Sequence, residues 1–266
     1  PFFLYLSEFA EHTPLQAEQD VAEKYAAKAD LLNYQHNATY AAMVESVDDT
    51  VGRLRAKLAM LGLEKDTVIF ITSDNGGLNY EGKSHTPVTF NQPLRAGKGH
   101  LYEGGVRVPL IVFDPQAKAR VEDFPVAGID FLPTIAAYAG APAPRGVDGI
   151  SLRELIRDAR RPAARELYWH YPHYSNQGGY PGGSIRDGDW KLIENYENGA
   201  LELYNLRADI REEKNLAFEQ AAKARELHTK LSAWRERVGA KMPAKNPDFD
   251  AAKADQGLTG ARRENQ

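Results

Sequence analysis

Three short apolar runs in the first half of the chain, residues 2–7, 68–73 and 109–113, have the length and composition of buried β-strands. Between the first two runs, apolar side chains recur at steps of three and four residues over positions 40–61, which is typical of an amphipathic helix. Gly62 follows as a helix stop. Buried strands that alternate with helices predict an α/β fold, with a mostly parallel sheet sandwiched by helices. In such sheets ligands bind beyond the carboxyl ends of the strands, so the polar residues there are candidates for chemistry.

The second half of the chain follows a different pattern. Residues 141–146 are rich in alanine and proline and mark the approach to a linker. Short β-like runs then alternate with turns; these runs are residues 166–171, 183–186, 190–194 and 201–206. Asp187-Gly188 is a hairpin signal between two of them. A helical pattern over residues 218–238 completes what we expect to be a small antiparallel sheet packed against one helix.

These patterns divide the chain into three predicted parts. Residues 1–150 form a portion of the α/β domain, residues 151–240 form a small α+β subdomain, and residues 241–266 form an extended or disordered tail rich in polar residues. The first apolar run starts at residue 1 without an initiator methionine or a signal-peptide pattern. We therefore expect that an upstream part of the α/β domain is missing from these residues.

Composition narrows the classes of protein. The 266 residues are 42% hydrophobic and carry a formal net charge of −4. A general nucleic-acid binder needs a basic surface, so that class is disfavoured. No apolar run reaches the ~18 residues that a membrane span requires. The absence of cysteine excludes disulfides and thiolate metal sites within the chain.

Asp74 and Asn75 directly follow the second apolar run, and Gly76 and Gly77 come next. A turn at the end of a buried strand can aim a carboxylate and an amide oxygen at one point. Hard cations such as Ca²⁺ and Mg²⁺ take oxygen ligands of this kind. The same residue types also form ordinary strand-to-loop turns, so the tetrapeptide alone leaves both readings open.

Lys98 lies between Gly97 and Gly99, with Arg95 and Arg107 nearby. Small neighbours let the backbone approach a ligand closely and leave the ammonium able to point inward. Together with the added positive charge, this predicts an anion site. The spacing of the glycines before the lysine does not fit a phosphate-binding P-loop. A flexible basic surface loop is the alternative.

Two further segments contain histidines. His12 comes shortly after the first apolar run, where an imidazole can donate to an anionic oxygen or act as a general acid. A histidine that is merely hydrogen-bonded at a strand end is the alternative there. Residues 169–177 combine aromatic rings, imidazoles and amides, which suit sugar hydroxyls. From this segment we select His170, His173 and Asn176 as candidate substrate contacts, with a packed structural loop as the alternative.

Together these segments resemble the formylglycine-dependent sulfatases of the alkaline-phosphatase superfamily, over nearly the whole chain. The segments that carry the resemblance are residues 2–16, 72–77 (TSDNGG), 93–109 (PLRAGKGHLYEGGVRVP), 130–134 (DFLPT), 185–192 (IRDGDWKL) and 202–206 (ELYNL). The segment 93–109 is the most specific of them. Ala96 replaces a commoner glycine there, which is a mild departure from the family pattern.

The resemblance implies a role for each matching residue. Asp74 and Asn75 would ligate Ca²⁺, with Mg²⁺ as a second possibility. Lys98 would hold a sulfate oxygen, and His12 would contact the ester near its bridging oxygen. The resemblance further implies an arylsulfatase-like enzyme, a sulfuric ester hydrolase acting on a glycan or small-molecule sulfate ester, in the periplasm or outside the cell. Its oligomeric state is not implied.

The family's nucleophile is a formylglycine made from Cys or Ser in the motif Cys/Ser-x-Pro-x-Arg, and the 266 residues contain no such motif. We expect it upstream, and we expect these residues alone to be inactive. Asp48-Asp49 is a tempting substitute for the family's first metal-ligand pair. Both aspartates lie in the helical pattern, where adjacent side chains point about 100° apart, so we interpret them as a solvated helix face.

Two other functions stay open at this point. A phosphodiesterase or phosphonate hydrolase of the same superfamily would share the metal chemistry, although the Lys98 segment favours a sulfatase. A non-catalytic module that binds sulfated glycans would not require the missing nucleophile.

Overall fold

The computed structural model describes residues 1–28, 35–79 and 88–250. They belong to two compact units, each of which is described by itself. Of the described residues, 1–28, 35–79, 88–90 and 107–164 belong to unit 1, and 91–106 and 165–250 belong to unit 2. Asn91–Val106, which contains Lys98, therefore packs with the C-terminal unit, although its place in the sequence is within the range predicted for the α/β domain.

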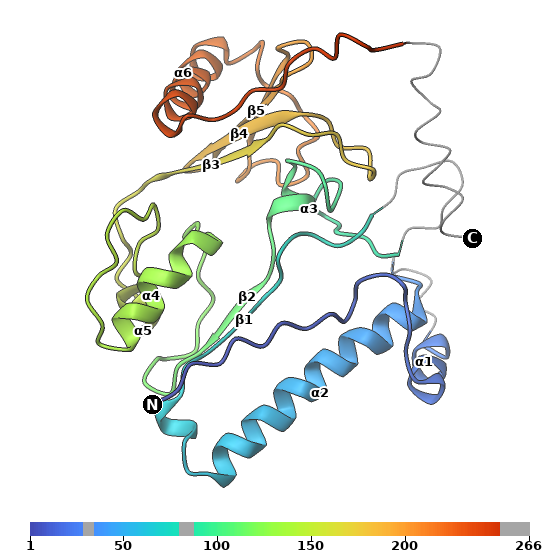
Figure 1. The fold of residues 1–266 in the computed structure, drawn as a ribbon, viewed down its shortest axis with the longest axis vertical. Helices are drawn as coiled ribbons and strands as arrows, with labels where there is room; N and C mark the ends of the chain where they lie inside the picture. The colour runs from blue at the N-terminus through green and yellow to red at the C-terminus, as the bar shows by residue number, and fades with distance from the viewer. Residues whose placement is uncertain (29–34, 80–87, 251–266) are drawn as a thin grey trace. The chain divides into compact units, whose positions relative to one another are not determined.

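Unit 1 contains helices and two short strands (Figure 1). Its elements are α1 (Gln19–Ala26), α2 (Ala38–Met60), η1 (Glu64–Asp66), β1 (Ile69–Thr72), β2 (Leu110–Phe113), η2 (Gly128–Asp130), α4 (Phe131–Tyr138) and α5 (Arg153–Asp158). The predicted helix over residues 40–61 and the two later strands are thus confirmed. Asp48 and Asp49 lie inside α2, as the helical pattern indicated.

Local chemistry explains the limits of α2. The side chain of Asn37 caps its first turn by accepting a hydrogen bond from the N–H of Tyr40 at 2.9 Å. At the other end Gly62 has φ +69, the left-handed conformation that commonly follows a helix. Met43 and Leu58 are buried and face the interior of unit 1, whereas Val44 and Met60 of the same helix are exposed.

The prediction for residues 2–7 was wrong. These residues form no strand, and their side chains are exposed, with Phe3 70% and Tyr5 80% accessible. An apolar run becomes a strand only where neighbouring strands satisfy its backbone N–H and C=O groups, and no described strand pairs with this run. The expected parallel pairing is also not formed among the described residues, because β1 and β2 pair antiparallel, with Ile69 opposite Phe113.

Unit 2 is a small antiparallel sheet with one long helix, as predicted. Its elements are α3 (Glu103–Val106), β3 (Glu166–Tyr171), β4 (Gly182–Asp187), β5 (Trp190–Asn195), β6 (Leu201–Asn205) and α6 (Ala221–Val238). The strands follow one another in sequence order, and Gly188 takes φ +60 in the predicted β4–β5 turn.

Two buried clusters hold unit 2 together. Figure 1 shows α6 lying over the antiparallel sheet. One cluster is formed by residues of these two elements and includes Ile185, Leu203 and Leu227. The other includes Leu101 and Tyr102, together with sheet residues such as Ile193 and Tyr204. Leu101 and Tyr102 follow Lys98 closely in the sequence, so this cluster attaches the Lys98 segment to the C-terminal sheet. 

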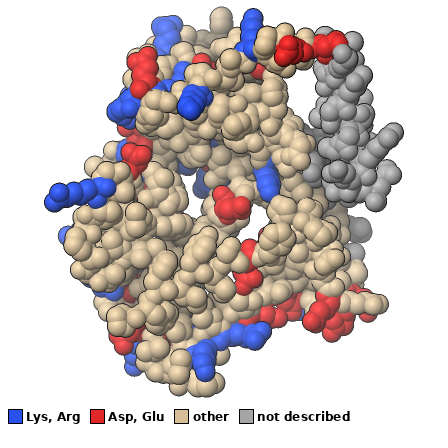
Figure 2. Space-filling model, in the orientation of Figure 1, with Lys and Arg blue, Asp and Glu red and all other residues tan. Residues whose placement is uncertain are grey.

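The described surface is mixed in charge. Figure 2 shows basic and acidic side chains both spread over the visible face. Among the described helices, none is both long and apolar enough to cross a membrane.

Candidate functional site

Lys98 lies at the tip of a tight turn in unit 2. The N–H of His100 donates to the carbonyl oxygen of Gly97 at 3.1 Å, and Gly99 takes φ +86. A type II turn needs a positive φ at its third residue, so Gly99 is required by the backbone itself. The Nδ1 of His100 approaches the carbonyl oxygens of Gly97 and Lys98 at 3.2 and 3.3 Å. Because carbonyl oxygens only accept, Nδ1 carries the proton and ties the imidazole to the turn.

The loop of residues 172–180 packs directly against this turn. A Cβ atom on Gly99 would collide with the side chain of Ser175, and one on Gly179 would collide with the carbonyl oxygen of Gly99. The loop is closed by a hydrogen bond of 2.8 Å from the N–H of Ser175 to the carbonyl oxygen of Gly179. The segment that the sequence singled out for sugar contacts therefore lies beside the candidate sulfate lysine.

Within this loop the three predicted contacts differ. His173 and Asn176 have exposed side chains, and the ring of His173 lies edge-on to Tyr171 with centroids 5.5 Å apart. His170 lies on β3, and both of its ring nitrogens are engaged inside unit 2. Its Nδ1 lies 2.8 Å from the hydroxyl of Tyr196, and its Nε2 lies 2.9 Å from the carbonyl oxygen of Lys241. These contacts give His170 a structural task, attaching the segment after α6 to the sheet.

Arg95 anchors the segment before the lysine. Its Nη1 donates to the hydroxyl of Tyr204 at 3.0 Å and to the carbonyl oxygen of Glu212 at 2.9 Å. Its guanidinium lies 3.9 Å from the ring centroid of Tyr102, within the range of a cation–π interaction. Glu202 accepts hydrogen bonds from the Tyr102 and Tyr204 hydroxyls, which fixes these two rings around Arg95.

Glu103 anchors the segment after the lysine. Its carboxylate accepts a hydrogen bond from Lys191 at 2.9 Å, and its N–H donates to Glu212 Oε2 at 2.6 Å. Lys191 also pairs with Glu212 Oε1 at 2.9 Å, and all three side chains are almost completely buried. Sequence reasoning left Glu103 without a definite role and missed Lys191 and Glu212. A lysine within the apolar run 190–194 was the one available signal, whereas Glu212 lies in a polar loop without periodicity.

Asp74 and Asn75 follow the end of β1 in unit 1, as the sequence predicted. Asp74 is exposed, and its Oδ1 accepts a hydrogen bond from the N–H of Asn75 at 2.8 Å. The hydroxyl of Ser73 donates to the carbonyl oxygen of Asn75 at 2.9 Å, so the turn is braced on both sides. Within residues 1–28, 35–79 and 88–250, no three histidine or acidic side chains are grouped closely enough to hold a metal ion.

His12 lies in a turn of unit 1 beside a strained residue. Glu11 has φ +77 and accepts a hydrogen bond from the hydroxyl of Tyr40 at 2.9 Å. Burial, together with the Glu11 carboxylate, raises the pKa of Tyr40 to about 12, so this hydroxyl stays protonated and donates. His12 itself is exposed, with Nδ1 2.8 Å from the carbonyl oxygen of Thr13.

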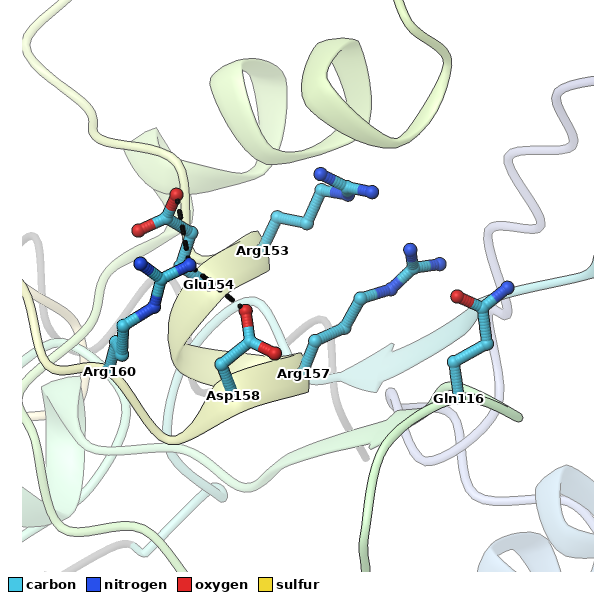
Figure 3. A pocket seen from close by; sticks show the side chains of 6 residues that line it. All are labelled: Gln116, Arg153, Glu154, Arg157, Asp158 and Arg160. Atoms are coloured by element: carbon cyan, nitrogen blue, oxygen red, sulfur yellow. Dashed lines mark hydrogen bonds and ion pairs between the residues drawn. The ribbon is translucent and has the colours of Figure 1, made fainter.

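A hollow of about 300 Å³ in unit 1 contains none of the predicted site residues (Figure 3). It is lined by Gln116, Arg153, Glu154, Arg157, Asp158 and Arg160. Arg160 pairs with Glu154 and Asp158, and Arg157 bonds Asp114 at 2.8 Å. The positive charge of the hollow is therefore largely compensated, and its geometry does not select an anion.

Comparison with known proteins identifies the family. The family model described as Sulfatase matches residues 1–141, which is more than half of the chain. The chain belongs to the sulfatase family. A second model, described as N-sulphoglucosamine sulphohydrolase, C-terminal, matches residues 96–237 of this sulfatase chain. The resemblance drawn from the motifs is thereby confirmed.

Individual relatives agree with this assignment. A sulfatase of Formosa agariphila is 36% identical over 263 residues, covering 88% of this chain and 46% of the relative. The crystal structure of Ps i-CgsB in complex with k-i-k-neocarrahexaose matches with a TM-score of 0.76 and 28% identity, over 99% of this chain and 56% of that one. The structure of BT4656 in complex with its substrate D-glucosamine-2-N,6-O-disulfate matches with a TM-score of 0.62 and 28% identity, over 85% and 46%.

These likenesses confirm the predicted fold class. The sulfatase chain carries an incomplete alkaline-phosphatase-like α/β fold and a small C-terminal antiparallel sheet with one helix. It spans about half the length of the relatives that it matches.

Proposed function

We propose that the protein carrying this chain hydrolyses sulfate monoesters of carbohydrates. The observation that carries the proposal is the Lys98 turn, a lysine held on a glycine turn that is fixed to the C-terminal sheet through both of its flanks. Two matched relatives, one bound to a carrahexaose and one to a glucosamine disulfate, support a carbohydrate as the substrate.

Lys98 binds an oxygen of the sulfuryl group. Its ammonium supplies a full positive charge where the sulfate is anionic and where charge is redistributed as the ester bond breaks. A preorganised cation of this kind stabilises the transition state without further reorganisation. The turn supplies that preorganisation, because its backbone is fixed by Gly99 and by the imidazole of His100.

Asp74 and Asn75 hold the divalent cation, Ca²⁺ or else Mg²⁺. Their carboxylate and amide oxygens suit a hard cation, and they account for two of the six to eight oxygen ligands that Ca²⁺ takes. The hydrogen bonds of their turn fit this task, because the N–H of Asn75 holds the Asp74 carboxylate and the Ser73 hydroxyl holds the backbone carbonyl of Asn75. When bound, the cation neutralises negative charge on the sulfuryl oxygens.

His12 is suited to proton transfer near the bridging oxygen of the ester. The leaving alcohol must be protonated, and an imidazole is the side chain best matched to that task near neutral pH. The bond between Tyr40 and Glu11 fixes the turn next to the imidazole. Formylglycine, as the family resemblance implies, is the proposed nucleophile, and an extracytoplasmic location is proposed on the same ground.

The loop of residues 172–180 selects the sugar. His173 and Asn176 are among its exposed polar side chains, and the loop packs on the lysine turn through Gly99 and Gly179. Contacts from such a loop would reach the alcohol portion of the ester, whereas Lys98 recognises only its sulfate.

Lys98→Ala in the complete protein tests the proposal, with Lys118→Ala as the control because Lys118 is an exposed lysine of unit 1. Turnover of an aryl sulfate, a sugar sulfate and a phosphodiester is measured for each variant. We expect Lys98→Ala to lower kcat/KM for both sulfates by about 10²-fold or more and Lys118→Ala to have no effect. Full activity of Lys98→Ala, or a preference of the parent protein for the phosphodiester, would contradict the proposal.

A further inference from the structure

Glu212 is a fully buried carboxylate that contacts both ends of the segment carrying Lys98. On one side its carbonyl oxygen accepts a hydrogen bond from Arg95 Nη1 at 2.9 Å. On the other side its Oε2 accepts a hydrogen bond from the N–H of Glu103 at 2.6 Å. Arg95 precedes the lysine by three residues and Glu103 follows it by five, so one residue holds both flanks of the turn.

The backbone of Glu212 is unusual. Its φ is +54, a left-handed conformation that glycine adopts without penalty and that disfavours a residue with a side chain. Strained conformations of this kind persist where the surroundings over-determine them, and they occur often at functional sites. In this conformation the backbone carbonyl of Glu212 accepts a hydrogen bond from Arg95, before the lysine, while its carboxylate accepts one from the N–H of Glu103, after the lysine.

The charge on Glu212 is balanced inside unit 2. Its Oε1 pairs with Lys191 at 2.9 Å, and Lys191 pairs equally closely with Glu103. Arg186 lies 3.7 Å from the second oxygen of Glu103, so two cations face two carboxylates. Burial and the neighbouring Glu103 carboxylate raise the pKa of Glu212, although Lys191 and the N–H of Glu103 act in the opposite direction. The contact with Lys191 offsets part of the cost of burying this carboxyl group.

We propose that Glu212 is a positioning residue for Lys98. It does not contact the substrate; it fixes the flanks of the turn at Arg95 and Glu103 and thereby sets the position of the ammonium. This inference rests on the proposed role of Lys98 in binding sulfate. Misplacement of a catalytic group by about 1 Å can lower a rate by about 10²-fold, so a distant anchor can have a large effect on turnover.

A double-mutant cycle between Glu212 and Lys98 in the complete protein tests the inference. Glu212→Gln retains an oxygen that can accept from the N–H of Glu103 but removes the charge opposite Lys191. Glu213→Gln is the matched control, because it is the same substitution at the neighbouring, exposed residue. Both changes are made in the parent protein and in Lys98→Ala, and kcat and KM are measured with an aryl sulfate and a sugar sulfate.

We expect Glu212→Gln to lower kcat for both esters by about 10- to 100-fold in the parent protein, and to lower it less than twofold in the Lys98→Ala background. Glu213→Gln should match its background in both cases. A residue that acts only through stability would instead cause the same fold-loss in both backgrounds, because effects of independent sites add in free energy. That result, or full activity of Glu212→Gln in the parent protein, would overturn the inference.

Two other outcomes are separable. If Lys98→Ala itself retains full activity, the proposed role of the lysine fails, and with it the premise of the positioning role. If Glu212→Gln does not accumulate as folded protein, Arg95→Gln replaces it in the cycle, because Arg95 is the partner of the Glu212 carbonyl and its side chain is 42% exposed. The same non-additivity with Lys98→Ala is then expected, and equal fold-losses in both backgrounds would overturn the inference.

Discussion

Gly99 and Gly179 pack backbone against backbone, so closely that a methyl group on Gly179 would collide with the carbonyl oxygen of Gly99. Gly99 belongs to the turn that presents Lys98, and Gly179 belongs to the loop that carries His173 and Asn176. The close contact explains how two segments about 80 residues apart in sequence become neighbours in unit 2. It also makes the position of the lysine turn sensitive to a single added methyl group.

Gly179→Ala should therefore destabilise unit 2 and impair the lysine turn. We expect a loss of about 1–3 kcal/mol in the free energy of unfolding, which is typical of overpacking, together with reduced kcat/KM for all sulfate esters. Gly52→Ala is the control, since Gly52 lies in α2 with open space around it and alanine favours a helix by about 0.5–1 kcal/mol. Urea denaturation and steady-state kinetics provide the measurements. Unchanged stability of Gly179→Ala would show that the two backbones are not in contact.

Removal of Lys191 should be strongly destabilising. Lys191→Ala leaves the carboxylates of Glu103 and Glu212 buried without their shared cation, and breaking a buried pair in this way costs about 3–5 kcal/mol. Lys230→Ala is the comparison. Lys230 also pairs with carboxylates, those of Glu166, Asp187 and Glu226, but its side chain is 36% exposed, so we expect a loss of about 1 kcal/mol or less. Similar losses for both variants would argue against a desolvated ion cluster.

Asp114 should make unit 1 sensitive to acid. Burial opposes ionisation of Asp114, but hydrogen bonds from Arg157, from the N–H of Gln116 and from the hydroxyl of Tyr138 outweigh it and lower its pKa. A carboxyl group whose pKa is lowered by folding adds stability above its unfolded pKa of about 3.9, and this stability is lost as the pH falls through the folded pKa.

Urea denaturation of the parent protein and of Asp114→Asn at several pH values tests this expectation. The difference in unfolding free energy between the two should be largest near neutral pH and should shrink below about pH 4. Asp158→Asn, a change at an exposed carboxylate, serves as the control and should produce little difference at any pH. A difference for Asp114→Asn that does not vary with pH would argue against the lowered pKa.

His173 and His170 should behave differently despite being three residues apart. His173→Ala should reduce kcat/KM for a sugar sulfate more than for an aryl sulfate, because an exposed loop contact distinguishes one alcohol from another. The difference corresponds to about 1–3 kcal/mol in activation free energy. His170→Ala should instead lower stability and affect both esters alike, since its ring is hydrogen-bonded to Tyr196 and to the backbone of Lys241. Equal losses on the two esters for His173→Ala would mean that the loop is structural.

Much of the local structure was predictable because it depends on local chemistry. The three- and four-residue spacing of apolar side chains defined α2, and the Asp187-Gly188 signal matched the turn between β4 and β5. The same reasoning failed for residues 2–7. Their composition favours a strand, but a strand also needs partners for its backbone hydrogen bonds. Composition does not predict which segments those partners are, and no described strand pairs with this run.

The features of the candidate site also separate into those set by local chemistry and those set by tertiary contacts. The sequence by itself determined the chemical types and the local geometry, namely a carboxylate and an amide after β1 and a lysine between two glycines. Only the tertiary structure decided that the lysine turn belongs with the C-terminal sheet, and that Glu212 holds it through Arg95, a residue 117 positions away. Periodicity and turn propensity report on neighbours along the chain. Contacts between distant segments depend instead on the pairing of buried charges and on close packing of backbones, and both form only when the whole unit folds.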